Sequence, residues 1–331
     1  MKKIKIAQIG TNTYSHANAI FGSLEKQSDI FEFVGYVFPE NERERIPKKA
    51  KAFQDYKELT LEEVLNNPEI EAVAIETDEI YLTKYALLAA KAGKHIHMEK
   101  PGGVDLAAFE ELIQTMKQTG KVFHTGYMYR YNPYIMDLLE RIRGGELGEI
   151  ISVEAQMNCI HNDAMRQWLK ALPGGMMFFL GCHLIDLILL IQGQPRKIIP
   201  LNKSTKVNTD AEDFGMAVFE YDNGVSFAKA SALEIGGYAR RQLVVTGTKG
   251  TVELKPLEMF ISKEGHYTEK TEYTERAWNH LGQHAKTPIF DRYESMMAGF
   301  AAYVRGEREN PYTLDYELEL YKTILKACGV E

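Results

Sequence analysis

Apolar and polar positions follow two alternating rhythms along the first third of the chain. Short apolar runs with strand character are separated by segments whose apolar residues recur every three to four positions, as on one face of a helix. One helix is short and begins with a capping box, because Thr60 is followed three residues later by Glu63. This alternation predicts βαβ units and hence a parallel, doubly wound sheet. The expected strands are residues 4–9, 31–38, 71–77, 95–99 and 121–127, and the expected longer helices are 15–27, 81–93 and 107–119.

The rhythm changes after about residue 125, where extended runs and hairpin signals become frequent. Asp222, Asn223 and Gly224 lie between two apolar runs, and the segment from Gly247 to Gly250 lies between two others. We therefore expect a Rossmann-type domain over residues 1–124 and an α+β domain with a large, mostly antiparallel sheet over residues 125–331. The expected extended runs of the second domain are residues 149–159, 214–233, 241–255 and 257–274, and its expected helices are 131–148, 181–192, 291–306 and 315–328.

Composition narrows the class of ligand. The chain has 331 residues, 45% of them hydrophobic, which suffices for two cores. A net charge of −7 and a pI near 5.8 argue against a nucleic-acid or anionic-membrane binder, because no basic surplus is available to neutralise phosphates. The three cysteines, Cys159, Cys182 and Cys328, form neither a disulfide framework nor a C-x-x-C motif. The first residues carry no apolar run that would fit a signal peptide, so a cytoplasmic location is expected.

The segment IAQIGTNTYSHA stands where a dinucleotide-binding turn follows the first strand. Gly10 occupies the first position of G-x-G-x-x-G, but Asn12 and Ser15 replace the other two glycines. Asn tolerates a positive φ, and Ser is small and a favoured helix N-cap. Hydroxyl groups of Thr11, Thr13 and Ser15 and the free N–H groups of the helix N-terminus remain as donors to an anion. We therefore expect cofactor binding here, weaker than an intact three-glycine turn gives.

Two further positions are candidates for chemistry. Lys100 and Pro101 directly follow an expected strand, at the edge where doubly wound sheets bind ligands. His183 lies near the start of a very apolar helix. Taken singly, such a lysine is more often a surface residue, and such a histidine is more often a hydrogen-bonded core residue.

Seven sequence features, each present once, are distributed along nearly the whole chain. They are Gly10 after the first strand and the strings AGKHIHMEKP, TGYMYRYNP, GELGEIISVE, GCHLIDL, EDFGMAVFEYDNG and VTGTKGTVEL. On these features the chain resembles the Gfo/Idh/MocA oxidoreductases from residue 4 to about residue 325. The resemblance implies an N-terminal Rossmann domain, a C-terminal α/β domain for substrate binding and oligomerisation, and substrates among sugars, inositols and related polyols.

The resemblance also implies roles for individual residues. Lys100 and His183 are the expected catalytic residues, where nicotinamide and substrate meet, and Arg130 helps to position the interdomain helix. The expected cofactor-binding residues are Gly10, Thr11, Asn12, Ser15, Phe38, Thr77, Glu99 and Lys100, and the expected substrate-binding residues are Arg130, Trp168, Phe179 and His183.

The chain departs from the family pattern at ligand-facing positions. Phe179 stands where the family has Asp in D-x-G-x-H, and Phe38 stands where an acidic residue precedes Pro at the end of the second strand. The third turn reads T-D-E-I-Y-L instead of T-P-N-x-x-H, which makes Asp78 and Glu79 candidate replacements for the acceptor that Phe179 lacks. Arg43 is a candidate contact for a 2′-phosphate within the run PENERERIPKKAK, which otherwise reads as a solvated loop and helix start.

The predicted function is an NAD(P)-dependent oxidoreductase that transfers hydride between nicotinamide and a hydroxyl or carbonyl carbon of a sugar- or inositol-like substrate. The alternative is a catalytically inactive or regulatory binding protein with the same fold. NAD is expected slightly ahead of NADP, and no metal is expected at His280 and His284, because no carboxylates complete a site there. The expected partner is a small polyol or sugar-like molecule, without nucleic acid or membrane, and the resemblance implies a homodimer or homotetramer.

Overall fold

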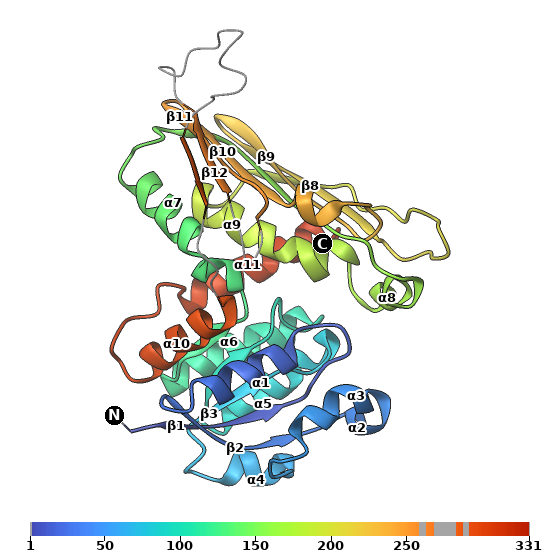
Figure 1. Ribbon diagram of the computed structural model, residues 1–331, viewed down its shortest axis with the longest axis vertical. Helices are drawn as coiled ribbons and strands as arrows, with labels where there is room; N and C mark the ends of the chain where they lie inside the picture. The colour runs from blue at the N-terminus through green and yellow to red at the C-terminus, as the bar shows by residue number, and fades with distance from the viewer. Residues whose placement is uncertain (1, 258–262, 268–282, 287–290, 331) are drawn as a thin grey trace. The chain divides into compact units, whose positions relative to one another are not determined.

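The computed structural model describes residues 2–257, 263–267, 283–286 and 291–330. The chain divides into two compact units (Figure 1). The first comprises residues 1–128 and 293–322, and the second comprises residues 129–292 and 323–331.

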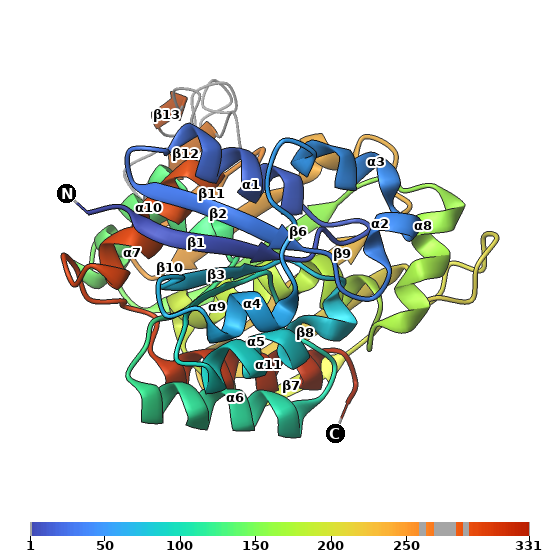
Figure 2. The ribbon, with the colours of Figure 1, turned by 90° about the horizontal axis from the view of Figure 1, so that it is seen from below.

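The first unit is built around five strands among its described residues. They form a fully parallel sheet in the order β2-β1-β3-β4-β5, which confirms the predicted doubly wound fold. Figure 2 shows α1 on one side of this sheet and α5 and α6 on the other. The elements up to residue 125 are β1 (Ile4–Ile9), α1 (Ala17–Lys26), β2 (Phe31–Val37), α2 (Glu42–Arg45), α3 (Pro47–Ala50), α4 (Leu61–Asn66), β3 (Ala72–Ile75), α5 (Leu82–Lys91), β4 (His95–Met98), α6 (Leu106–Thr119) and β5 (Phe123–Thr125).

Local signals decide where the helices of this unit begin. α4 begins with the predicted capping box, in which Thr60 Oγ1 accepts from the Glu63 N–H at 3.1 Å and the Glu63 carboxylate accepts from the Thr60 N–H at 2.6 Å. α1 begins at Ala17, two residues later than predicted, and the Ser15 N–H donates to the Asn12 side chain at 2.9 Å. The side chain of Asn12 therefore organises the residues just before this helix.

A C-terminal segment, residues 293–322, packs with the first unit, although the sequence assigned everything beyond residue 124 to the second domain. It contains most of α10 (Arg292–Val304) and the first part of α11 (Leu314–Ala327). Phe300 stacks on His124 with ring centroids 5.4 Å apart, and Tyr321 stacks on Phe109 at 4.2 Å. These helices are amphipathic in sequence, but the sheet that their apolar side meets is decided by contacts over long distances along the chain.

The second unit contains an eight-stranded sheet among its described residues, in the order β13-β12-β11-β10-β6-β9-β8-β7. Neighbouring strands are antiparallel except β6 and β9, which confirms the predicted mostly antiparallel sheet. Both predicted hairpins form, with Tyr221 paired to Gly224 and Gly247 paired to Gly250. The elements are α7 (Pro133–Arg143), β6 (Ile150–Asn158), α8 (Asp163–Trp168), α9 (Cys182–Gln192), β7 (Lys197–Pro200), β8 (Phe214–Tyr221), β9 (Gly224–Ser231), β10 (Gln242–Gly247), β11 (Gly250–Leu254), β12 (Lys263–Tyr267) and β13 (Gln283–Lys286).

α9 packs against β6 and β9, and almost all of its residues are buried, as its apolar sequence predicts. A π-helical turn, Met177–Gly181, leads directly into α9 and extends the predicted helix toward the N-terminus. The predicted extended run 257–274 contains β12, while residues 258–262 and 268–274 lie outside the described residues. Within the described ranges, no helix combines the length and apolar character that crossing a bilayer requires.

Candidate functional site

One candidate site lies in the first unit, at the carboxyl edge of the parallel sheet, where the turns after β1 and β3 meet. β1 pairs with β2 on one side and with β3 on the other, so this is the topological switch point of the sheet. Gly10 has a φ of +93°, and a Cβ atom there would lie 2.6 Å from the Thr77 backbone nitrogen. Only glycine fits such an approach, so Gly10 is required for the two turns to touch.

The N–H groups of this turn already bind carboxylates. The Thr11 N–H donates to Glu42 Oε2 at 2.9 Å, and the Thr13 N–H donates to Asp78 Oδ1 at 2.6 Å. These two backbone donors lie in the turn before α1 and are already engaged, which the sequence did not predict. The same contacts show that the turn binds anionic oxygens, so its donors fit the phosphates of a dinucleotide.

The charged run after β2 is mostly exposed, as its composition suggests, but three of its side chains contact the turn or the residues beside it. Glu42 is fully buried, Arg45 pairs with Asp78 at 2.9 Å, and Lys49 donates to the Ser15 carbonyl at 2.9 Å. The three side chains are spaced by three and four residues, so they lie on one side of the α2–α3 segment, toward the turn. That spacing was the sequence signal that could have identified them.

The end of β2 is aromatic where a carboxylate would bind the adenosine ribose. Phe38 packs against Tyr36 and Phe53, with ring centroids 4.5 and 5.3 Å away. The Arg43 guanidinium lies over the Phe38 ring at 5.5 Å, donates to the Tyr36 hydroxyl at 3.1 Å and pairs with Glu58. A cation on an apolar platform therefore stands at this position.

Buried ionisable groups gather after β3 and β4. Lys100 is 3% exposed, and its Nζ lies 4.0 Å from a Glu99 carboxylate oxygen. Glu79 and Glu76 are fully buried; burial raises the pKa of Glu79 to about 8 and raises that of Glu76 well above its usual range. The sequence does not reveal that Glu76 is buried, because a lone glutamate after an apolar run resembles an exposed strand end. Lys100 is thus buried next to the carboxyl group of Glu99.

Two histidines lie behind this edge within the sheet. His97 on β4 and His124 on β5 are cross-strand neighbours, and their Nδ1 atoms are 2.7 Å apart, so one ring donates to the other. Burial lowers the pKa of His97 to about 3, which keeps this ring neutral. The pair is therefore a hydrogen-bonded core contact in the first unit.

A separate candidate site lies within the second unit, around the start of α9. His183 is buried, and its ring meets Tyr129 edge-to-face with centroids 5.4 Å apart. Three residues further along the helix, Asp186 forms a buried, two-point pair with Arg130, at 2.9 and 2.8 Å. Because Asp186 and His183 share one side of α9, this pair fixes the helix that carries the histidine.

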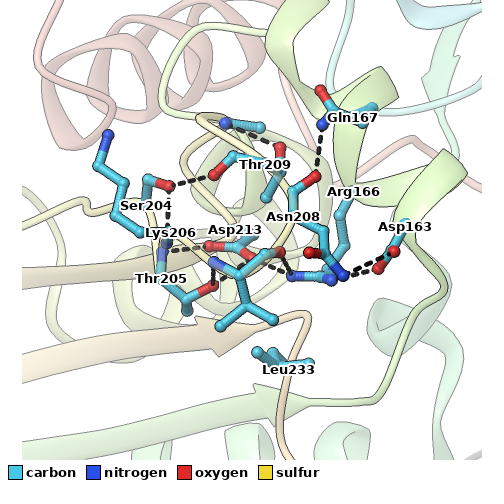
Figure 3. Close-up of polar contacts among 12 residues, drawn as sticks. Asp163, Arg166, Gln167, Ser204, Thr205, Lys206, Asn208, Thr209, Asp213 and Leu233 are labelled. Atoms are coloured by element: carbon cyan, nitrogen blue, oxygen red, sulfur yellow. Dashed lines mark hydrogen bonds and ion pairs between the residues drawn. The ribbon is translucent and has the colours of Figure 1, made fainter.

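Phe179 and Trp168 form an apolar wall one turn before His183. Their rings meet edge-to-face at 5.2 Å, and Phe179 is buried. Figure 3 shows how α8, which ends at Trp168, is held: the Arg166 guanidinium donates to Asp213 at 2.9 Å, and Asp213 also accepts from the Thr205 N–H at 2.7 Å. The loop before β8 thus anchors the helix that carries Trp168.

In the part of the chain that the structure describes, no group of three or more His, Cys, Asp or Glu side chains is placed to hold a metal ion. His284 lies on β13, and His280 lies outside the described residues. Cys159, Cys182 and Cys328 are free and buried.

A parallel sheet with a close glycine turn at its switch point, together with a second unit built on a mostly antiparallel sheet, defines a class of two-domain, dinucleotide-binding proteins. Residues 4–127 match the family profile described as "Oxidoreductase family, NAD-binding Rossmann fold", and residues 135–253 match "GFO/IDH/MocA C-terminal domain". The chain belongs to the Gfo/Idh/MocA family of oxidoreductases.

Individual relatives are more distant. The uncharacterized oxidoreductase YhhX of Escherichia coli (strain K12) is 29% identical over 195 residues, which cover 58% of this chain and 54% of YhhX. The scyllo-inositol 2-dehydrogenase (NAD(+)) of Bacillus subtilis (strain 168) is 27% identical over 219 residues, 62% of this chain and 63% of that protein. The matched part of the chain thus spans less than two thirds of either relative.

Among solved structures, the WlbA dehydrogenase of Bordetella pertussis, determined with NADH and UDP-GlcNAcA, has a TM-score of 0.77. The sequence identity is 17%, and the match covers 99% of this chain and 97% of that one. At this identity the likeness establishes the shared fold.

Proposed function

We propose that this protein is an NAD(P)-dependent oxidoreductase that transfers hydride between nicotinamide and a hydroxyl or carbonyl carbon of a sugar- or inositol-like substrate. The observation that carries the proposal is the burial of Lys100 directly after β4, at the same sheet edge as the Gly10 turn. Burying an ammonium group costs desolvation free energy and therefore does not favour folding. A buried lysine at a ligand-binding edge is better explained by a role in catalysis.

The proposed roles follow from the charge and proton capacity of two side chains. When bound, the nicotinamide supplies or takes up the hydride. Lys100 stabilises the negative charge that develops on the substrate oxygen, and His183 removes the hydroxyl proton in oxidation and returns it in reduction. Arg130 acts through Asp186 by holding α9 in place, and it is proposed as a positioning residue.

The contacts at the end of β2 favour NADP, whereas the sequence led us to expect NAD slightly ahead. No carboxylate follows β2 at Phe38, and the Arg43 guanidinium lies on that ring. A carboxylate there would bind the ribose 2′-hydroxyl of NAD, and an arginine suits a 2′-phosphate. To bind that phosphate, Arg43 would exchange its pairing with Glu58.

The substrate class rests on the relatives and on the wall formed by Phe179 and Trp168. Two of the three proteins named above are a dehydrogenase of scyllo-inositol and a dehydrogenase solved with UDP-GlcNAcA, and both of these ligands carry hydroxylated rings. An aromatic pair accepts an apolar face of such a ring but no hydroxyl hydrogen bond. We therefore propose a ring substrate that is less hydroxylated on the side facing Phe179.

The rival function is a binding protein without turnover. The observations that favour it are the carboxylates already bound to Thr11 and Thr13 and the aromatic end of β2, both of which weaken cofactor binding.

Calorimetry with NAD, NADH, NADP and NADPH tests the first step, followed by oxidation and reduction assays on a panel of sugars, inositols and cyclic diols with each cofactor that binds. We expect NADPH to bind more tightly than NADH and at least one ring substrate to turn over. Absence of binding heat for all four at about 1 mM, which corresponds to roughly 4 kcal/mol, contradicts the proposal. Binding without turnover on the whole panel favours the rival.

A further inference from the structure

The turn after β1 is occupied by two carboxylates that come from distant parts of the chain. Glu42 lies 31 positions after Thr11, and Asp78 lies 65 positions after Thr13, yet both accept hydrogen bonds from the backbone of the turn. Both carboxyl groups are almost completely buried, with Glu42 at 0% and Asp78 at 4% exposure. Two carboxyl groups thus stand where a Rossmann turn binds the two charges of a pyrophosphate.

These carboxylates are unequally supported. Asp78 also pairs with Arg45 at 2.9 Å. Glu42 Oε1, by contrast, is buried without a hydrogen-bond partner among the described residues. Burial raises the pKa of Glu42 to about 8, with the nearby Asp78 charge acting in the same direction, so the ionised form of Glu42 is poorly accommodated.

Two cations of the α2–α3 segment also lie at this turn. Lys49 donates to the Ser15 carbonyl at 2.9 Å and to Asn12 Oδ1 at 3.3 Å, and Arg45 stands beside Asp78. An anion that displaced the two carboxylates would therefore find these positive charges already in position. The α2–α3 segment supplies both the internal competitor and part of the counter-charge.

We propose that Glu42 and Asp78 compete with the cofactor pyrophosphate for the amides of the turn, and that binding exchanges these carboxylates for phosphate oxygens while Lys49 remains. The proposal rests on the cofactor binding proposed above and extends it to affinity, because each binding event must first release two internal hydrogen bonds. One backbone N–H cannot donate fully to a carboxylate and a phosphate together, and like charges repel across the turn.

The test compares variants that remove negative charge from the turn with a variant that removes positive charge from it. Glu42→Gln and Asp78→Asn keep size and a hydrogen-bond acceptor but remove charge, and each should tighten NADPH binding about tenfold by calorimetry at pH 9, where Glu42 is ionised. Lys49→Met should weaken it about tenfold. The control is Glu111→Gln on α6, which removes an equal charge from an exposed ion pair with Lys91 of α5 and should leave the affinity for NADPH unchanged.

Suppose that the wild type binds NADPH measurably and that both charge-removal variants bind it equally well or more weakly. The competition is then overturned, and the proposed function stands. A different outcome would contradict the proposed function but support the competition. If the wild type binds no dinucleotide but Glu42→Gln/Asp78→Asn binds inorganic pyrophosphate or NADPH, the competition is supported and the proposed function fails. If the double variant folds but binds neither, the competition is overturned.

Folding of each variant is checked by its melting curve. Should one unfold, the wild-type amide resonances of Thr11 and Thr13 carry the test instead. Saturating NADPH must shift both resonances, since their acceptors change, and resonances that stay in place overturn the proposal.

Discussion

The Gly10 turn in the first unit and the start of α9 in the second unit are two candidate sites that are built in different ways. At the turn, residues from β1, α2–α3 and the segment after β3 meet through hydrogen bonds between charged groups and backbone. Around α9, Phe179 and His183 lie four residues apart on one continuous helical stretch, Trp168 of α8 packs on Phe179, and Asp186 forms a buried ion pair with Arg130. The first arrangement depends on charges that a ligand can replace, and the second depends on packing that a ligand cannot replace.

This difference separates two kinds of sensitivity. Substitutions at the turn should change ligand affinity and the pH dependence of stability. Substitutions around α9 should change the free energy of unfolding or the substrate preference. The predictions that follow run from the largest expected effect to the smallest.

Arg130→Met should destabilise the second unit by about 3–5 kcal/mol, because it leaves the buried Asp186 carboxylate without its cation. Urea unfolding followed by circular dichroism measures the change. Arg130→Met/Asp186→Leu should recover most of the loss, since apolar side chains replace a buried pair at little cost. A loss below about 1 kcal/mol for Arg130→Met would mean that the pair does not hold α9.

Lys100→Met should lower kcat at least about 100-fold, equivalent to about 2.7 kcal/mol of transition-state stabilisation, while the fold and most cofactor affinity remain. Steady-state kinetics on the substrate identified by the panel, with calorimetry of the cofactor, measure both quantities. Lys91→Met, on the exposed surface of α5, is the matched control and should retain full turnover. Near wild-type kcat in Lys100→Met would return this lysine to a structural role.

Stability should fall as the pH rises from about 4.5 to about 8. Burial raises the pKa of Glu42 and that of Glu79 to about 8, so the folded protein binds more protons than the unfolded chain in this window. Glu42→Gln should remove roughly 4 kcal/mol of that pH dependence, as measured by denaturant unfolding at pH 5 and pH 9. Identical slopes in wild type and variant would show that Glu42 ionises without penalty in the folded state.

Phe179→Asp should shift kcat/KM toward more hydroxylated ring substrates by up to about tenfold, because it adds an acceptor that the aromatic wall lacks. The new charge should also move the pH–rate profile upward, and its burial should lower stability. Phe179→Leu, which keeps the wall apolar, is the control. An unchanged ranking of substrates together with an unchanged profile would identify Phe179 as packing only.

Much of the fold was predictable because it follows from periodicity and local signals. The five parallel strands, the capping box at Thr60 and the hairpins at Gly224 and Gly250 each depend on residues close together in sequence. The glycine at position 10 was predictable for the same reason, since a tight turn after a strand requires it. The sequence did not predict that residues 293–322 belong to the first unit. An amphipathic pattern shows which side of a helix is buried but not which sheet that side contacts.

The sequence by itself determined the order of elements, the class of fold and the positions of Lys100 and His183 on it. Only the tertiary structure decided that Glu42 and Asp78 bind the turn, that Arg43 lies on Phe38, and that Arg130 is paired with Asp186. The physical reason is range. The pattern of neighbouring residues along the chain indicates whether a side chain is buried. A buried charge, however, needs a partner, and folding decides which opposite charge or N–H group comes within about 3 Å of it.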